Sequence, residues 1–175
     1  NTLLGGLAGA ALTDADFNIA VGYGALDSDT LGSRSVAIGY NSLATQNFTT
    51  ATNTYNVAVG HDAGRAVTTG TNNVLVGGLT GDAITTGSNN TALGGGALSE
   101  NTTASSNTAV GYYALLSNTT GAGNAALGKT SLATNTTGTL NAAFGQDALG
   151  LNTTGSNNTA VGESALYANT TASNN

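Results

Sequence analysis

Apolar and polar positions alternate along this chain in blocks that return every 17 residues. Each block opens with a short apolar run of the form Asn-x-Ala-Val-Gly, continues with Ala-Leu, and ends in a polar stretch of Asn, Thr, Gly and Ser. Between the third and fourth blocks the spacing is 21, which marks a four-residue insertion in the third. We therefore interpret residues 1–175 as a single repeat array. Its units begin at Asn1, Asn18, Ser35, Asn56, Asn73, Asn90, Asn107, Asn124, Asn141 and Asn158.

The unit has the consensus N-T-A-V-G-x-x-A-L-x-x-N-T-T-G-S-N, and we number its positions as columns 1 to 17. Column 5 is Gly in all ten units, which indicates a corner with positive φ or a close approach of backbones. Column 4 is always apolar, whereas column 9 is Leu in seven units and Gly in three, namely Gly9, Gly64 and Gly81. Each unit is predicted to hold a short strand before the Gly corner, a second short strand around Ala-Leu, and a polar turn.

One unit of this length cannot fold alone. Ordering its backbone opposes folding by at least about 17 kcal/mol, whereas burying two or three aliphatic side chains returns only about 5–8 kcal/mol. Bonding between successive units must supply the difference, so the units are predicted to stack. The predicted fold is all-β: a flat, two-sided β-solenoid (β-roll) of ten coils with two short strands per coil. Columns 4 and 9 are expected to form two continuous aliphatic ladders.

Composition narrows the range of functions. Gly, Thr and Asn supply 26, 30 and 22 of the 175 residues, and only 7% are charged. The absence of Cys and the single His, His61, exclude a disulfide framework, a zinc finger and a Cys/His catalytic pair. Three basic residues against nine acidic ones leave no basic surface for nucleic acid. Because no acid/base pair recurs, we expect neither an enzyme nor a bound cofactor or metal. No membrane insertion is expected either, since the apolar stretch near Leu7 to Leu12 is too short to cross a bilayer.

The repeat resembles a known family. Ser35-Val-Ala-Ile-Gly39 and Asn158-Thr-Ala-Val-Gly162 are similar to the short repeat in the heads of trimeric autotransporter adhesins, the YadA-like left-handed β-roll. Asn107-Thr-Ala-Val-Gly-Tyr-Tyr-Ala-Leu115, followed by Asn-Thr-Thr-Gly, resembles arrays in bacteriophage tail fibres and in large surface proteins of aquatic bacteria. The resemblance covers the whole chain and implies a β-roll that trimerises. The usual unit of the family is shorter than the unit found in this chain.

Columns 6 and 7, directly after the Gly corner, vary most and carry many of the charges and aromatic rings. Variation beside constant columns indicates a solvent-facing edge. One interpretation is a recognition strip whose Tyr rings stack on sugars or on a partner chain. The other interpretation, which we favour, is a solvated rim or a seam between chains. The candidate strip residues are Tyr23, Tyr40, His61, Asp62, Tyr112 and Tyr113.

Column 12 begins five successive Asn-Thr-Thr segments, each of which has the sequence of an N-glycosylation acceptor. One interpretation is a glycan-coated filament. The other, which we favour, is a ladder of Asn side chains that hydrogen-bond from coil to coil. The residues concerned are Asn101, Asn118, Asn135, Asn152 and Asn169, and the acceptor sequence recurs at Asn47, Asn89 and Asn157.

Three smaller features also have alternative interpretations. Thr-rich columns on a solenoid can order water, but columns 13 and 14 are adjacent, whereas a flat ice-binding face needs Thr at alternate positions. The only acidic cluster is interpreted as surface charge, because it lacks a complete calcium loop. The insertion, at or beside residues 46–50, is expected to bulge as a loop in which Phe48 makes a contact or tucks against the roll. The acidic cluster consists of Asp14, Asp16, Asp27 and Asp29.

These patterns predict an extracellular structural fibre segment that acts as a rigid spacer or adhesive shaft, foremost as part of a bacteriophage tail fibre. The alternatives are a bacterial surface filament or adhesin that stacks end to end and carries glycans, and an ice-binding solenoid. The expected partners are copies of the chain itself, as a trimer or an end-to-end filament, together with a cell-surface glycan. The expected location is the surface of a virion or of a bacterial cell.

Overall fold

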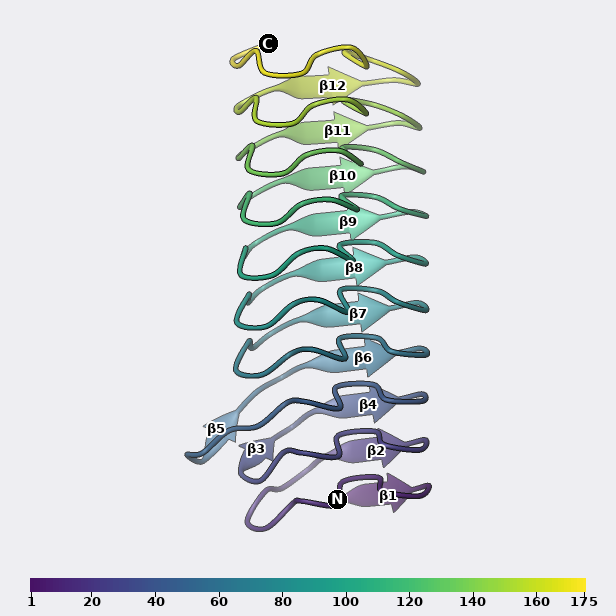
Figure 1. The fold of residues 1–175 in the computed structure, drawn as a ribbon, viewed down its shortest axis with the longest axis vertical. Coiled ribbons are helices and arrows are strands. Elements are labelled where there is room, and N and C mark those ends of the chain that lie inside the picture. The colour runs from purple at the N-terminus through teal and green to yellow at the C-terminus, as the bar shows by residue number, and fades with distance from the viewer.

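Ten short parallel strands stacked in one sheet dominate the fold (Figure 1). The computed structural model describes residues 1–175. Each strand pairs with the next at the same column, so that Val59 lies beside Val76, Val76 beside Leu93, and Leu93 beside Val110. The β-solenoid predicted from the repeat, with like columns stacked on one another, is thereby confirmed. The sheet consists of β1 (Thr2–Leu4), β2 (Ile19–Val21), β4 (Val36–Ile38), β6 (Val57–Val59), β7 (Val74–Val76), β8 (Thr91–Leu93), β9 (Thr108–Val110), β10 (Ala125–Leu127), β11 (Ala142–Phe144) and β12 (Thr159–Val161).

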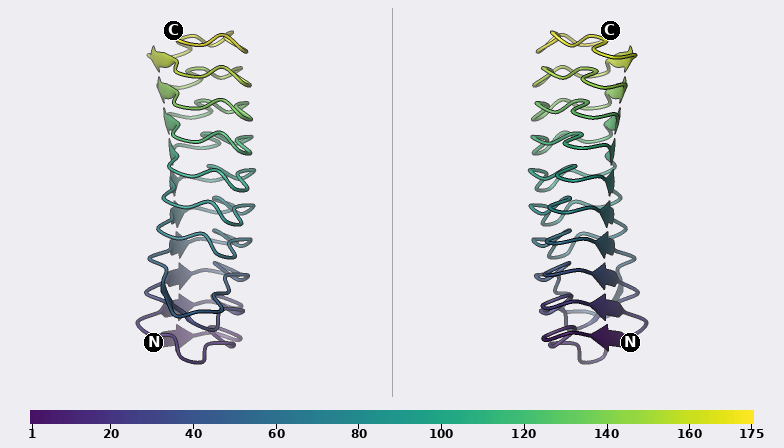
Figure 2. Two further views of the ribbon diagram at one scale, coloured as in Figure 1. Left: turned by 90° about the vertical axis from the view of Figure 1, so that its left-hand side faces the viewer. Right: turned by 90° about the vertical axis from the view of Figure 1, so that its right-hand side faces the viewer.

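The sheet forms one side of a flattened roll, and an irregular backbone segment forms the other side (Figure 2). The second strand predicted around Ala-Leu is wrong, because columns 7 and 9 have positive φ in every coil, as at Asn41 (51°) and Leu43 (50°). This segment still bonds from coil to coil: the Leu43 N–H donates to the Ala63 carbonyl at 3.1 Å. Of 113 backbone hydrogen bonds, 94 lie outside the strands, and many of these, like the Leu43–Ala63 bond, join successive coils on the irregular side. The structure contains no helix that could span a membrane.

The core is lined by columns 3 and 9, whereas column 4 points outward. Column 3 is Ala in eight coils and is buried from β2 onward, while its neighbours in column 4 are half-buried or exposed. Successive residues of a strand point to opposite faces, so the small column and the large column cannot both face the interior. The predicted aliphatic ladder of column 4 is present, and it lies on the outside of the sheet. The buried ladder of column 9 is present as Leu26, Leu43, Leu98, Leu115, Leu132 and Leu149.

Leucine at column 9 adopts a backbone conformation that it disfavours. A left-handed φ opposes folding by roughly 1–2 kcal/mol for a residue with a Cβ, whereas full burial of Leu contributes roughly 1.5–3 kcal/mol. Burial therefore outweighs strain at Leu98 and Leu115, both of which are fully buried. Glycine at the same column avoids the strain but leaves space in the core.

That space is filled from other columns. The three coils with Gly at column 9 are the three with an aliphatic residue at column 12: Leu12, Val67 and Ile84. A Cβ added at Gly81 would lie 2.8 Å from Ile84 Cδ1 and 2.9 Å from Leu75 Cδ2, which shows that these two side chains occupy the volume of the missing Leu. Larger side chains at columns 3 and 12 thus fill the core volume that column 9 leaves empty.

Asn side chains of column 1 hold the start of each strand. The Asn73 Oδ1 accepts a hydrogen bond from the backbone N–H of Asn90 at 3.0 Å, and the Asn73 Nδ2 donates to the Gly87 carbonyl at 2.9 Å. The same pair of contacts recurs from Asn107 to Asn124 and onward along the sheet. Because one amide satisfies a turn carbonyl and the next coil's N–H together, column 1 fixes both the turn and the coil register.

The insertion departs from the regular roll at its flank. β3 (Gly32–Ser33) and β5 (Thr52–Asn53) pair there as a separate two-stranded sheet, which projects at the lower left of Figure 1. Phe48 is buried, and its N–H donates to the Asp29 carboxylate at 3.1 Å. That carboxylate also accepts Gln46 Nε2 at 2.6 Å. Asp29 is fully buried, so the interpretation of the acidic cluster as surface charge is wrong for this member, because column 12 faces the interior.

The glycines of column 5 are expected to be irreplaceable. A Cβ at Gly111 would lie 2.6 Å from the Gly128 carbonyl oxygen, and its φ is +133°. We expect Gly111→Ala to lower the free energy of unfolding by at least about 2 kcal/mol, measured by chemical denaturation. Gly78→Ala is the matched control, because a Cβ there meets no atom within 4 Å and its φ lies outside the left-handed region. Equal stability of the two variants would contradict the close stacking of the glycine corners.

The exchange between columns can be tested by rebuilding a consensus core. Gly81→Leu alone is expected to destabilise the fold by about 1–3 kcal/mol through overpacking. Combining it with Leu75→Ala and Ile84→Asn should restore stability to within about 1 kcal/mol of the parent chain, since the three sites share one volume. Additive losses in the triple variant, measured by the same denaturation, would show that the columns are independent.

Candidate functional site

The outward face of the ten-stranded sheet is the most extensive candidate surface. It consists of columns 2 and 4 of the strands, and none of these twenty residues is charged. Column 4 forms an unbroken row of aliphatic and aromatic side chains, including Leu93 (39% exposed), Leu127 (52%) and Phe144 (42%). Column 2 adds Ile19 and three valines in the first half of the sheet and mostly Thr or Ala beyond it. The face is therefore continuous, apolar and free of charge along its whole length.

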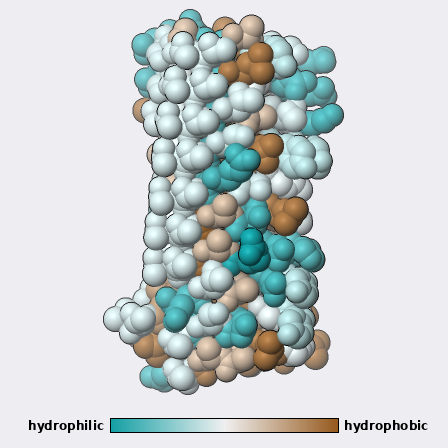
Figure 3. Space-filling view, in the orientation of Figure 1, coloured by the Kyte–Doolittle hydropathy of each residue, from teal (hydrophilic) through white to brown (hydrophobic).

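The rest of the surface differs from this face. Figure 3 views the molecule from the side opposite the sheet, where apolar residues form separate patches among polar ones. The two Thr columns differ in their environment. Hydroxyls of column 13 donate to a backbone carbonyl of the next coil, as Thr102 Oγ1 does to the Thr119 carbonyl at 3.2 Å, whereas the Thr residues of column 14 are exposed. The threonines thus offer one free rank, formed by Thr69, Thr86, Thr103, Thr120, Thr137, Thr154 and Thr171.

The candidate strip residues lie along one edge of the solenoid but in two groups. The rings of Tyr23, Tyr40 and His61 stack on one another, with centroids 5.8 Å and 5.1 Å apart. Tyr112 and Tyr113 form a separate pair with centroids 3.9 Å apart. Gly78 and Gly95, which occupy column 6 in the two coils between, separate the groups because they carry no ring.

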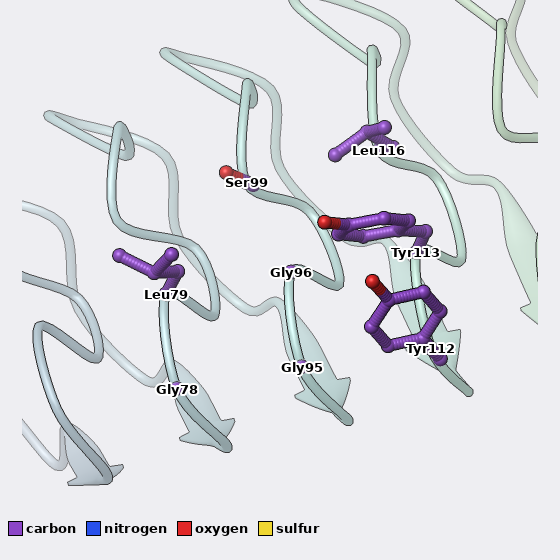
Figure 4. A pocket seen from close by; sticks show the side chains of 8 residues that line it. All are labelled: Gly78, Leu79, Gly95, Gly96, Ser99, Tyr112, Tyr113 and Leu116. Atoms are coloured by element: carbon purple, nitrogen blue, oxygen red, sulfur yellow. The ribbon is translucent and has the colours of Figure 1, made fainter.

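The two tyrosines of the second group influence each other's chemistry. Both side chains project beside the preceding coil, and the Tyr113 ring extends over Gly96 (Figure 4). Hydrogen bonding with the Tyr113 side chain, followed by desolvation, raises the pKa of Tyr112 above its ordinary value of 10.0. The Tyr112 phenol therefore keeps its proton at neutral pH and remains a hydrogen-bond donor.

His61 and Asp62 lie next to each other on this edge. The His61 Nδ1 is 3.5 Å from the Asp62 Oδ2, and the His61 side chain is 63% exposed. The Asp62 Oδ1 is buried without a hydrogen-bond partner. No group of three His, Asp or Glu side chains that could hold a metal ion is present in the structure.

The Asn residues of column 12 form a ladder of side-chain amides inside the roll. Asn118 Nδ2 donates to Asn101 Oδ1 at 3.0 Å, Asn135 Nδ2 to Asn118 Oδ1 at 2.8 Å, and Asn152 Nδ2 to Asn135 Oδ1 at 2.9 Å. Asn169 continues the row at 3.1 Å and is partly exposed, whereas the other four are fully buried. A buried amide whose donor and acceptor are both engaged offers no access for glycan attachment.

The acceptor sequences outside column 12 have a different environment. Asn47, Asn89 and Asn157 are exposed, so their side chains are open to modification. On the edge that follows the Gly corner, the Thr130 hydroxyl donates to the Asp147 carboxylate, and with Gln146 this lowers the pKa of Asp147 below its ordinary value of 3.8. These positions are scattered over the surface and do not converge on a common site.

Comparison with known protein families, curated proteins and solved structures gives no match. The surfaces themselves must therefore carry the functional argument. The sequence analysis predicted the column 4 ladder but did not say which side of the sheet it occupies. The signal was present: column 3 is mostly Ala and column 4 is always larger, as in Ala109 and Val110, and neighbours in a strand cannot share a face.

The amide ladder is expected to be a large source of stability. Asn118→Ala leaves the buried Asn101 Oδ1 without its donor and removes the acceptor of Asn135 Nδ2, while the Gly121 carbonyl keeps its bond from Asn107 Nδ2. We expect a loss of about 2–4 kcal/mol in the free energy of unfolding. Thr120→Ala, two residues away on the exposed rank, is the control and should change stability by less than about 0.5 kcal/mol. A loss for Asn118→Ala no greater than that of the control would contradict the ladder.

Proposed function

We propose that the protein is an extracellular structural fibre segment, a rigid shaft whose outward face packs against the outward faces of two further copies. The observation that carries this proposal is the uncovered parallel sheet. Parallel sheets in soluble proteins are almost always covered on both faces, and here only the inner face is covered by the chain itself. A charge-free apolar face of ten strands is the type of surface that marks an interface.

A second copy of the chain is the partner that fits this face. The rows of columns 2 and 4 repeat once per coil, at the spacing of hydrogen-bonded strands, about 4.8 Å. Only a surface with the same repeat can keep its side chains in step with these rows over all ten strands. The lack of charge removes any electrostatic penalty for placing identical faces together. The number of three copies follows the resemblance to trimeric adhesin heads.

The shaft function follows from how the coils are joined. Backbone bonds and the column 1 side chains connect successive coils along the roll, and the buried Leu row and the column 12 amides add contacts in the coils that carry them, so bending the rod requires many contacts to break together. A rod of this kind holds a distal part away from a surface. We assign it foremost to a bacteriophage tail fibre, following the resemblance of the repeat, with a bacterial surface filament as the alternative.

Polar substitution of the outward face is expected to dissociate the assembly. Replacing Val59, Val76, Leu93 and Val110 by Thr keeps strand propensity and removes about 1 kcal/mol of apolar burial at each site. The association constant should fall on the order of a thousandfold per chain, measured by sedimentation equilibrium. Leu140→Asn and Leu151→Thr together form the control, since both leucines are exposed elsewhere. A monomeric parent chain at high concentration would overturn the proposed packing.

The location can be tested by immunogold electron microscopy with antibodies raised against the purified chain. Label on the tail fibres of virions supports the first assignment, and label on filaments of bacterial cells supports the alternative. Label found only inside cells would contradict both.

A further inference from the structure

A pocket of about 320 Å³ lies on the edge of the solenoid, where columns 6 and 7 of three successive coils meet (Figure 4). Gly78, Gly95 and Gly96 form its floor, and Tyr112 and Tyr113 form one wall. Leu79 closes the opposite side in the coil below, and Ser99 and Leu116 complete the lining. The pocket is separate from the outward face of the sheet and lies beyond the Tyr23–Tyr40–His61 stack.

The fold does not require two of the floor glycines. Column 6 accepts Tyr, His, Lys, Gln or Glu in other coils, and the φ angles of Gly78 and Gly95 lie outside the left-handed region. A Cβ at Gly78 would meet no atom within 4 Å, and one at Gly95 would be in ordinary contact with the Tyr112 ring at 3.6 Å. Side chains would therefore fit at both positions, and their absence leaves the pocket open. Gly96 differs, because its φ is +65° and a Cβ there would lie 2.3 Å from the Tyr113 ring.

The lining defines the chemistry of a ligand. No lining residue is charged, and the apolar part consists of two Tyr rings and two Leu side chains. Polar groups are supplied by the two Tyr hydroxyls and by Ser99, whose Oγ donates to the Asp82 Oδ1 at 2.7 Å and keeps its lone pairs available. Tyrosine offers an apolar ring face and a hydroxyl together, which matches a molecule with C–H faces and peripheral hydroxyl groups. That combination describes a neutral sugar ring.

The size of the site favours a sugar over a macromolecular contact. The volume lies at the lower end of the range for small-molecule pockets, roughly 300–1,000 Å³. Eight lining residues are far fewer than the roughly 20–30 residues per side in a stable protein interface. The geometry points to a binding site for one neutral pyranose ring of a glycan, held against the Tyr112–Tyr113 pair above the glycine floor. This inference goes beyond the proposed shaft function and does not depend on self-association.

The site can be tested with the intact chain by NMR titration. The probes are the methyl pyranosides of glucose, galactose, mannose and N-acetylglucosamine, each added separately. We expect saturable shifts of the Tyr112 and Tyr113 ring signals with at least one probe, and saturation transfer to its ring C–H protons. Gly78→Val fills the floor without backbone strain, and it should weaken binding by about tenfold or more while leaving the unfolding midpoint unchanged.

Tyr23→Ala is the matched control, because it removes an exposed ring from the same edge outside the pocket. Unchanged binding in this variant supports the assignment. The inference is overturned if no probe gives a saturable shift, if Gly78→Val binds as well as the parent chain, or if Tyr23→Ala loses binding to the same extent. Sedimentation of Gly78→Val should match the parent chain, so that a failure of the shaft proposal and a failure of the sugar site are distinguishable.

Discussion

The return of the chain to the same position after each coil is the constraint on which the whole structure depends. At that spacing a backbone N–H finds the carbonyl of the neighbouring coil, and each side chain meets its counterpart from the same column. The column 12 Asn amides show this directly. Asn118 donates to Asn101 and accepts from Asn135, so that one side chain links three coils. Strands, irregular turns and side-chain ladders are consequences of one register rather than separate sources of order.

The same register separates what is buried from what is displayed. Within each strand the small residue of column 3 faces inward and the larger residue of column 4 faces outward, as in Ala92 and Leu93. The irregular side supplies the buried leucines that the sheet does not. A thin roll of this kind encloses too little volume for two rows of large side chains, so the larger residues of the sheet lie on its outer face.

The repeat made the architecture predictable and left the local conformation open. Period, stacking and coil boundaries follow from the spacing of column 5 glycines such as Gly94 and Gly111. The alternation of left-handed residues on the second side could not be anticipated, because column 9 carries Leu, a residue that rarely adopts positive φ. Burial overrides that preference only once neighbouring coils are in place. The tyrosine pocket was equally hidden: the sequence placed Tyr112 and Tyr113 on the edge, but the open floor beside them depends on Gly78 in an earlier coil.

At two places along the edge, a column 7 side chain lies over a glycine in the coil before its own. The Tyr113 ring fills the space above Gly96, and the Asn41 side chain fills the space above Gly24. Other coils hold side chains in succession at this column, as Leu79 follows Asp62, so the requirement for glycine is local. Gly24 and Gly96 are each constrained by the residue of the following coil, and replacing either glycine requires the side chain above it to move or to become smaller.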